Sequence, residues 1–335
     1  MPRLLLLLAC CLLPLHQAWA WGHTGHREIS LLAMRNLPED LPEALRSPAA
    51  IALVGALGPE LDLSKGSGVP HDAELDPGHY MNLDAEGLVA GLVPLDRLPA
   101  SREAYDSLLR AGGSSQYRAG YLLYALHSGW QQTTKDFAWL RAALAGERLG
   151  ETEADRAWFT ALAAHRTQRA LHNLGTWSHY VADASQPLHV STHHNGWGPH
   201  PNPRGFTQDR GLHARFEGAF IRSQINWQAV AAALPAPRDC ACTPRQRLVE
   251  YLRTTLAQVE PLYELEQTGA FRGQGTPQGV AFATARLAAG AAELRDLITL
   301  AWRASANEKV GWPAQSVAEM EAGRLRMHRA MFWAD

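Results

Sequence analysis

The chain has 335 residues and a formal net charge of −2, with 19% of its residues charged. The absence of net positive charge excludes capture of nucleic acid over a broad basic surface. A nuclease of this composition would need a local positive field, which bound metal ions could supply. The length suits one large domain or two small ones.

The first 20 residues are typical of an export signal. A positive start at Arg3 precedes an apolar run over 4–15, and Ala18-Trp19-Ala20 is a small-x-small cleavage site. Cleavage there would make Trp21 the first residue of the mature chain. We therefore divide the chain into a signal peptide, 1–20, and one folded domain, 21–335.

Lipidation at Cys10 is the alternative for this segment, since Leu-Leu-Ala-Cys loosely resembles a lipoprotein processing site. The apolar run is too short to span a bilayer, and no later stretch is long and apolar enough for a transmembrane helix. The sequence thus predicts an exported protein, periplasmic or secreted.

Helical periodicity dominates the rest of the chain, and alternating strand patterns are scarce. The pattern predicts helices over 25–36, 101–111, 115–130, 135–145, 153–184, 209–225, 244–266, 276–304 and 315–332. We see neither an internal repeat nor a flexible interdomain linker. An all-α single domain is the prediction.

Two segments break the helical rhythm. Residues 60–84 place carboxylates and two histidines in Gly/Pro-rich sequence, and 191–211 add three histidines with Trp197 and Phe206. Loops that hold such side chains commonly form the rims of functional sites. Solvated turns with incidental histidines are the alternative.

The segment HYVADASQPLH, from His179 to His189, holds the most informative side chains. His179 and Asp183 are four residues apart, so a helix places them on one face. Pro187 then breaks the helical pattern and turns His189 to the same side. A lone pair of this kind is weak evidence for metal binding, but His213 and Glu217 in GLHARFE repeat the spacing.

Further histidines lie near carboxylates or near the mature N-terminus. They are His23 and His26, close to Trp21, and His79 in DPGHY. The available ligands are imidazoles and carboxylates, with no usable thiolate. This set suits zinc in an exported protein, with manganese or iron as alternatives.

These motifs together resemble the zinc-dependent phospholipase C / S1–P1 nuclease superfamily. WGHTGH, DPGHY, HYVADASQPLH and GLHARFE occur in motif order through nearly the whole mature chain. The resemblance implies an all-α fold that binds three zinc ions at the bottom of a cleft. It also implies hydrolysis of phosphodiester bonds by a water that the metal ions activate.

The resemblance assigns the ligands in three sets. Trp21 would bind one zinc through its α-amino group and carbonyl oxygen, together with His26 and the bridging Asp183. The other two sets would be His79, His179, Asp183 and an upstream aspartate, and then His189, His213 and Glu217. His23 receives no ligand role.

Asp62 is our choice for the upstream aspartate, although its distance from His79 along the chain is longer than usual in the family. Asp72 and Asp76 are the alternatives. The carboxylate in this position would orient the nucleophile or act as a general base. Asp62 and Asp183 are therefore the candidate catalytic residues.

The substrate is less constrained than the chemistry. Glu217 within HARFE, where P1-type nucleases tend to have Trp-Asp, looks like the phospholipase C side, whereas WGHTGH looks like the nuclease side. We favour phospholipase C slightly, with transient contact to a membrane surface, over a nuclease for single-stranded DNA or RNA. A non-catalytic zinc-binding helical protein is the third hypothesis.

Trp197 and Phe206 are the candidate substrate contacts under both enzymatic hypotheses. They would touch lipid in a phospholipase or stack on bases in a nuclease. Packing within their own loop is the alternative. Cys240 and Cys242, the only cysteines after export, are expected to form a local disulfide or to remain free thiols, with no catalytic role.

Overall fold

The computed structural model describes residues 21–332, so the proposed signal peptide and Cys10 lie outside the described residues. Within this range helices dominate, and the named strands form only two short hairpins. The all-α prediction is confirmed. No helix of the described part of the chain combines the length and the apolar character that crossing a bilayer requires.

The longer helices are α1 (Gly22–Arg35), α3 (Pro48–Leu57), α6 (Arg102–Ala111), α8 (Leu122–Leu149), α9 (Glu153–Asp183), α13 (Pro244–Leu256), α14 (Val259–Gln267) and α15 (Pro277–Ser305). The short ones are α2 (Glu43–Arg46), α4 (Glu60–Leu63), α5 (His71–Leu75), α7 (Gln116–Ala119), α10 (Leu212–Ala214), α11 (Ile221–Gln224), α12 (Trp227–Ala232) and α16 (Val317–Glu321). The 3₁₀ segments are η1 (Asp76–His79), η2 (Leu95–Arg97), η3 (Pro187–His189) and η5 (Arg329–Met331), and η4 (Arg215–Phe220) is a π-helix. The antiparallel hairpins pair β1 (Leu88–Val89) with β2 (Val93–Pro94) and β3 (Lys309–Val310) with β4 (Gln315–Ser316).

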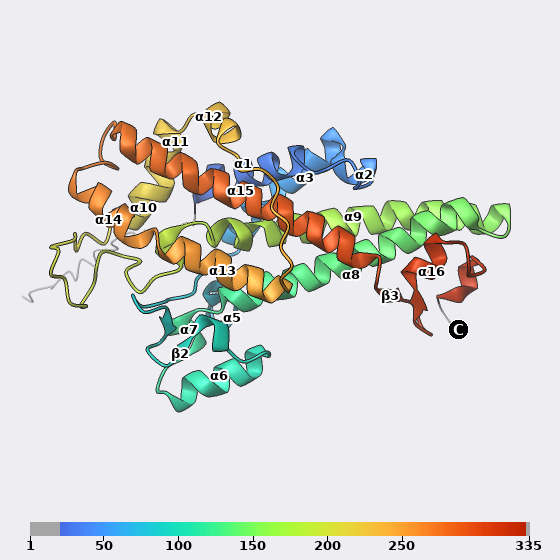
Figure 1. Ribbon diagram of the computed structural model, residues 1–335, viewed down its shortest axis with the longest axis horizontal. Helices are drawn as coiled ribbons and strands as arrows, with labels where there is room; N and C mark the ends of the chain where they lie inside the picture. The colour runs from blue at the N-terminus through green and yellow to red at the C-terminus, as the bar shows by residue number, and fades with distance from the viewer. Residues whose placement is uncertain (1–20, 333–335) are drawn as a thin grey trace, which may run out of the picture.

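Helices α8 and α9 form a long antiparallel pair along the molecule (Figure 1). Glycines on α8 let the two backbones approach closely: Gly129 lies against the Trp177 ring and Gly146 against Phe159. A reciprocal capping box between Thr152 and Asp155 begins α9. Because α9 ends at Asp183, the HYVAD motif lies at the end of this helix, inside the molecule.

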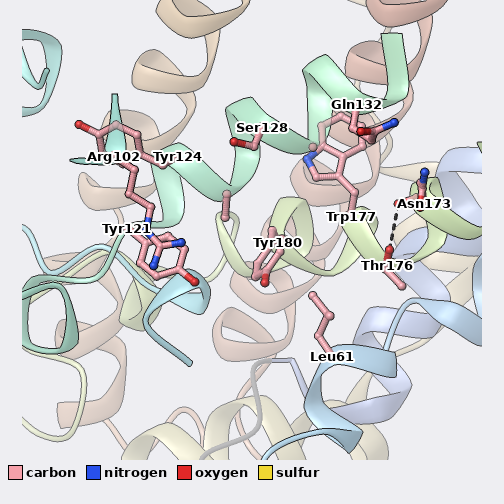
Figure 2. Close-up of a pocket in the computed structure, with 12 residues that line it drawn as sticks. Leu61, Arg102, Tyr121, Tyr124, Ser128, Gln132, Asn173, Thr176, Trp177 and Tyr180 are labelled. Carbon is pink, nitrogen blue, oxygen red and sulfur yellow. Dashed lines mark hydrogen bonds between the residues drawn. The ribbon is translucent and has the colours of Figure 1, made fainter. Parts of the chain in front are cut away.

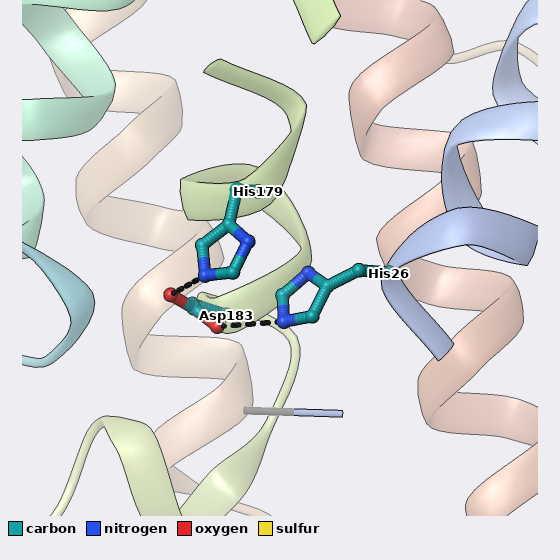
Figure 3. Close-up of side chains that lie close together, drawn as sticks. All are labelled: His26, His179 and Asp183. Carbon is teal, nitrogen blue, oxygen red and sulfur yellow. Dashed lines mark ion pairs between the residues drawn. The ribbon is translucent and has the colours of Figure 1, made fainter. Parts of the chain in front are cut away.

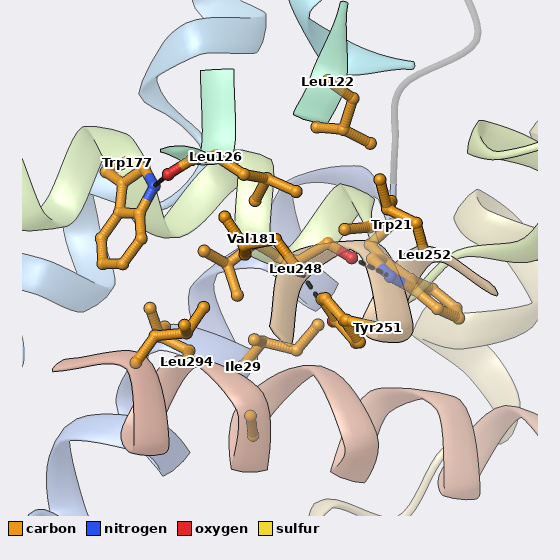
Figure 4. Packing of buried hydrophobic residues seen from close by; sticks show 14 of the residues in the cluster. Trp21, Ile29, Leu122, Leu126, Trp177, Val181, Leu248, Tyr251, Leu252 and Leu294 are labelled. Carbon is orange, nitrogen blue, oxygen red and sulfur yellow. Dashed lines mark hydrogen bonds between the residues drawn. The ribbon is translucent and has the colours of Figure 1, made fainter. Parts of the chain in front are cut away.

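Helices α1, α3 and α15 pack around this end of α9. Figure 4 shows Trp21, Ile29, Val181, Tyr251 and Leu294 in the shared core. Two hydrogen bonds fix the last turn of α9, because the indole N–H of Trp21 donates to the Ala182 carbonyl at 2.9 Å and the Tyr251 hydroxyl donates to Val181 at 2.9 Å. The backbone on either side of the HYVAD carboxylate is therefore held from two directions.

The helix boundaries differ from prediction in several places. The helix predicted over 244–266 is two helices, α13 and α14. The separate helices predicted over 115–130 and 135–145 are one helix, α8, preceded by the short α7 and a break at Gly120, where φ is +75°. The helix continues through the polar run over 131–135, where it packs against α9 and α15. The helix predicted over 315–332 is instead a strand, α16, a turn region and η5.

Cys240 and Cys242 are joined in a disulfide, the first of the two alternatives expected from sequence.

Candidate metal centre

Three groups of buried histidines and carboxylates lie close enough to hold metal ions. In each group the ligand atoms are within 4.8 Å of one another. The groups are His26, His179 and Asp183; Asp62, His79 and His179; and His189, His213 and Glu217. The structure thus brings together all eight side chains that the sequence proposes as ligands besides Trp21.

Asp183 is the central side chain of the site. One carboxylate oxygen, Oδ1, lies 3.4 Å from His26 Nε2. The other, Oδ2, lies 3.1 Å from His79 Nδ1 and 3.5 Å from His179 Nε2. Figure 3 shows His26 and His179 on the two oxygens of this carboxylate, an arrangement that suits a bridging ligand.

Backbone carbonyls orient two of the imidazoles. Nδ1 of His179 lies 2.8 Å from the Gly58 carbonyl oxygen, and Nδ1 of His189 lies 2.7 Å from the His79 carbonyl oxygen. When Nδ1 donates in this way, Nε2 carries the free lone pair and faces the neighbouring ligands. Metal-binding histidines characteristically have such a partner on the nitrogen that does not bind the metal.

The third group is built across three elements, with His189 at the end of η3. His213 in α10 and Glu217 in the π-helix η4 are four residues apart, and His213 Nε2 lies 2.8 Å from Glu217 Oε2. Gln186 donates its side-chain amide to the same oxygen at 3.2 Å. π-Helical turns often occur at functional sites, where the wider turn re-aims a side chain.

Several buried polar atoms of these groups have no hydrogen-bond partner. They include both ring nitrogens of His26, Asp62 Oδ2, Asp183 Oδ1, His189 Nε2 and Glu217 Oε1. A buried polar atom without a partner costs about 1–3 kcal/mol, so a cluster of them requires an explanation. Divalent cations would satisfy one nitrogen of His26 and the carboxylate oxygens, and imidazole and carboxylate are donors that zinc accepts. The residues therefore fit metal ions.

Burial sets the protonation states in this cluster. It lowers the pKa of His26, His79 and His179 well below the ordinary 6.5, which keeps these rings neutral as metal ligands must be. Burial raises the pKa of Asp183 well above 3.8, with the nearby Asp62 charge adding to the shift. In the absence of cations, the folded protein thus disfavours charge on the very carboxylate that metal ions would stabilise.

Glu217 behaves differently. Burial by itself would raise its pKa, but the positive potential and hydrogen bonds of His213 and His189 outweigh it and lower the pKa to about 2. Glu217 is consequently ionised throughout the physiological range.

Asp62 is the upstream aspartate that lies in the cluster. Its Oδ1 is 3.6 Å from His179 Nε2 and 2.6 Å from the ammonium of Lys65. Of the two alternatives, Asp72 pairs with His71 on the surface side of α5, and Asp76 lines the adjoining cavity. Within the described residues, neither belongs to the metal-binding groups.

Trp21 is fully buried beside the cluster. Its indole N–H also lies 2.8 Å from Ser185 Oγ, so the ring is fixed near the residues that follow Asp183. Gly22 lies against the Glu217 backbone. The start of α1 is therefore next to the proposed ligands, whereas His23 is exposed and belongs to none of the groups.

A cavity of about 530 Å³ opens onto the centre. His79, His189 and His213 form its metal-binding wall. Asp76, an alternative for the upstream aspartate, also lines it, and the remaining lining side chains, apart from Leu188, were not identified from the sequence as site residues: Lys65, Tyr80, Asn82, Tyr117, Arg118, His194 and Asn195. The only feature of the sequence that could have placed Lys65 in the site is its position three residues after Asp62. Nothing in the sequence indicates that Tyr117 and Arg118 line the cavity.

Trp197 and Phe206 do not line this cavity. Both are buried, and their rings pack against each other and against Tyr263. The Trp197 ring also stacks on His193, with 3.7 Å between centroids. The structure therefore favours loop packing for these two residues over direct contact with a substrate.

A second groove, of about 410 Å³, runs between α8 and α9 (Figure 2). Tyr121, Trp177 and Tyr180 give it an aromatic wall, and Gln132 and Asn173 line it farther along. Leu61 and Tyr180 adjoin Asp62 and His179 in sequence, so this groove lies behind the metal-binding residues. It shares no lining residue with the larger cavity.

No protein-family model and no curated protein matches the chain. A crystal structure of Clostridium perfringens alpha-toxin, isolated from an avian strain, is similar with 12% identity and a TM-score of 0.34. The match covers 86% of this chain and 66% of that one. So distant a likeness leaves the function to be argued from the site itself.

Proposed function

We propose that the protein is a zinc-dependent phosphodiester hydrolase and that its substrates are phospholipids. The observation that carries this proposal is the clustering of three metal-binding groups, two of which line one cavity through His79, His189 and His213, with Asp183 facing two of the groups. Three zinc ions would occupy these groups. Bound there, they would lower the pKa of a water molecule and neutralise the charge of a phosphate group.

The side chains have distinct roles in this scheme. Asp183 would be a ligand at two of the metal positions. Hydrogen bonds to backbone carbonyls would fix the rings of His179 and His189 so that Nε2 faces the metal. Asp62 would orient the attacking water and accept its proton. The α-amino group of Trp21 would be a further ligand in a chain that begins at this residue.

Lys65 supports a phosphate ester as the substrate. Burial would lower the pKa of its ammonium, but Asp62 and Asp183 raise it, so the side chain remains charged. This cation lines the same cavity as His79 and His189. An anionic oxygen of the substrate can therefore be met by the metal centre on one side and Lys65 on another.

A nuclease for single-stranded DNA or RNA is the second candidate, because of the other residues in the cavity. Tyr80 and Tyr117 offer rings on which bases could stack, and Arg118 offers a cation for a backbone phosphate. The apolar surroundings of the opening, described below, favour the phospholipid. In either case the signal proposed for 1–20 would direct the protein to the periplasm or out of the cell.

A parallel assay tests this proposal. The zinc-loaded protein is offered a soluble phosphocholine ester, phosphatidylcholine vesicles, single-stranded DNA and single-stranded RNA, each with and without a chelator. We expect chelator-sensitive release of phosphocholine and no cleavage of nucleic acid. Release of nucleotides alone would reject the phospholipase in favour of the nuclease, and inactivity of a fully zinc-loaded protein on all four would reject both.

A further inference from the structure

Exposed apolar side chains concentrate around the opening of the cavity. Among the described residues, six large hydrophobic side chains are exposed, and four of them belong to segments that line or border this cavity. Tyr117 lines it directly. Leu63, Val69 and Leu75, which we call the apolar rim, are 58%, 88% and 42% exposed. Single exposed apolar residues are ordinary, but such a concentration beside a site indicates an interaction surface.

The segment that carries the rim also supplies the site. Asp62 and Lys65 face the metal-binding residues, and Asp76 lines the cavity. The rim residues Leu63 and Leu75 are the chain neighbours of Asp62 and Asp76, yet they are exposed to solvent. One side of this segment therefore belongs to the cavity while the other presents apolar side chains outward.

One hydrogen bond fixes this segment to the residue that precedes α8, and another joins two residues of the cavity wall. The Tyr121 hydroxyl donates to the Glu74 carbonyl at 2.6 Å, and the Tyr80 hydroxyl donates to the Tyr117 carbonyl at 2.5 Å. The rim consequently presents its side chains at a defined place beside the opening. A surface that contacts the rim would lie next to Lys65 and Asp76, which line the cavity.

The charges nearby exclude attraction to an anionic surface as the driving force. Asp72 and Glu74 lie within the rim segment, and two of the nearby cations are paired, Lys65 with Asp62 at 2.6 Å and Arg102 with Glu74 at 3.7 Å, while Arg118 in the cavity wall is a further cation. Polybasic clusters are what bind proteins to anionic lipid. Arg118 is a single cation beside two acidic side chains and not such a cluster, so apolar contact is the main attraction, and this suits a surface of zwitterionic lipids.

We propose that the apolar rim inserts into the head-group region of a zwitterionic phospholipid bilayer and so holds the cavity at the membrane surface. The proposal rests on the phospholipase function proposed above. Its physical basis is the burial of Leu63, Val69 and Leu75 against lipid. Removing one such side chain should weaken binding roughly tenfold, because burial of a leucine-sized group contributes about that factor or more.

The experiment measures binding and hydrolysis separately. The zinc-loaded protein is sedimented with phosphatidylcholine vesicles and with vesicles containing phosphatidylglycerol, and hydrolysis is followed on vesicles and on a soluble phosphocholine ester. The variants are Val69→Ser and the triple Leu63→Ser, Val69→Ser, Leu75→Ser. Trp312→Ser is the matched control, since Trp312 is 80% exposed but lies in the C-terminal hairpin region, away from the cavity.

We expect Val69→Ser to bind phosphatidylcholine vesicles roughly tenfold more weakly and the triple variant at least a hundredfold more weakly. Both should hydrolyse the soluble ester at the wild-type rate, and Trp312→Ser should bind normally. Phosphatidylglycerol should not strengthen binding.

Unchanged binding of the triple variant, or absence of wild-type binding, would overturn the membrane proposal even if the soluble ester is hydrolysed. Stronger binding to phosphatidylglycerol would overturn its apolar basis. Binding that depends on the rim, without hydrolysis of either substrate, would instead reject the proposed function and leave the docking surface.

Discussion

Asp183 contributes more to the proposed centre than any other single side chain. Its two oxygens face different imidazoles, and burial makes its ionised form unfavourable unless cations are present. The carboxylate is thus suited to bridging metal ions and poorly suited to a purely structural role.

Asp183→Asn should therefore lower zinc content and activity together. Loss of partners that merely orient metal ligands costs 10- to 100-fold, so loss of a bridging ligand should reduce activity by at least about 100-fold. Metal analysis of the purified variant beside its rate on the substrate would show this. Asp72→Asn is the control, since that carboxylate is outside the groups, and full zinc content in Asp183→Asn would count against the scheme.

The metal-free protein should lose stability as the pH falls from 7 to 5. Below 6.5 the unfolded chain binds protons on His26, His79 and His179, whereas burial prevents their uptake in the folded chain. Asp183 opposes the trend because its raised pKa makes the folded chain bind that proton first, but it is one group against three. Between pH 4.5 and 2, protonation of Glu217 in the unfolded chain adds a further loss.

Thermal unfolding of chelator-treated protein at pH 7, 6 and 5 measures this dependence. The midpoint should decrease at each step. A constant or rising midpoint would show that these histidines are not held neutral in the folded protein.

At the scale of elements, the close contact of α8 with α9 positions the centre. A methyl group on Gly129 would lie 1.9 Å from Cδ1 of Trp177, two residues before His179. At the other end of the pair, a methyl group on Gly146 would lie 2.2 Å from Cγ of Phe159, far from the ligands. The two glycines permit the same packing at different distances from the site.

Gly129→Ala and Gly146→Ala should each destabilise the protein by about 1–3 kcal/mol, because both overpack the helix interface. Only Gly129→Ala should also weaken zinc binding, since it displaces the turn that carries His179. Urea unfolding and a zinc titration of both variants separate the effects. Equal zinc affinity in the two would mean that the α8–α9 contact does not position the ligands.

Sequence reasoning predicted the elements best where the pattern was long and periodic. Helix α9 was expected over 153–184 and runs over Glu153–Asp183, because its cap and its apolar stripe are local signals. The segment 60–84 was expected as a loop, yet it contains α4, α5 and η1. Helices this short depend on tertiary contacts, such as the Tyr121 hydroxyl on Glu74, that no local pattern records.

In the site, too, local spacing predicted some residues, whereas the position of others depends on tertiary contacts. The spacing of His179 and Asp183 predicted a pair that the fold brings together, because an i,i+4 pair on an α-helix depends only on local geometry. The same spacing predicted the pair of His213 and Glu217, but the π-helix η4 that carries Glu217 was not expected. The burial of Trp197 and the place of Tyr117 in the cavity wall could not be anticipated. Both are set by segments that meet only after folding.

At the scale of the whole molecule, a chain of slight negative charge concentrates buried carboxylates and neutral imidazoles in one place. Bound cations would account for this cluster. The proposed hydrolysis requires them, and the proposed membrane surface lies beside the cavity that they would border. The metal centre is thus the central claim.

Diffraction from crystals of the zinc-loaded protein at the zinc absorption edge tests it most directly. The account predicts three anomalous peaks: one beside His26 and Asp183, one among Asp62, His79 and His179, and one among His189, His213 and Glu217. No peak at these groups, or zinc bound only elsewhere on the protein, would contradict it.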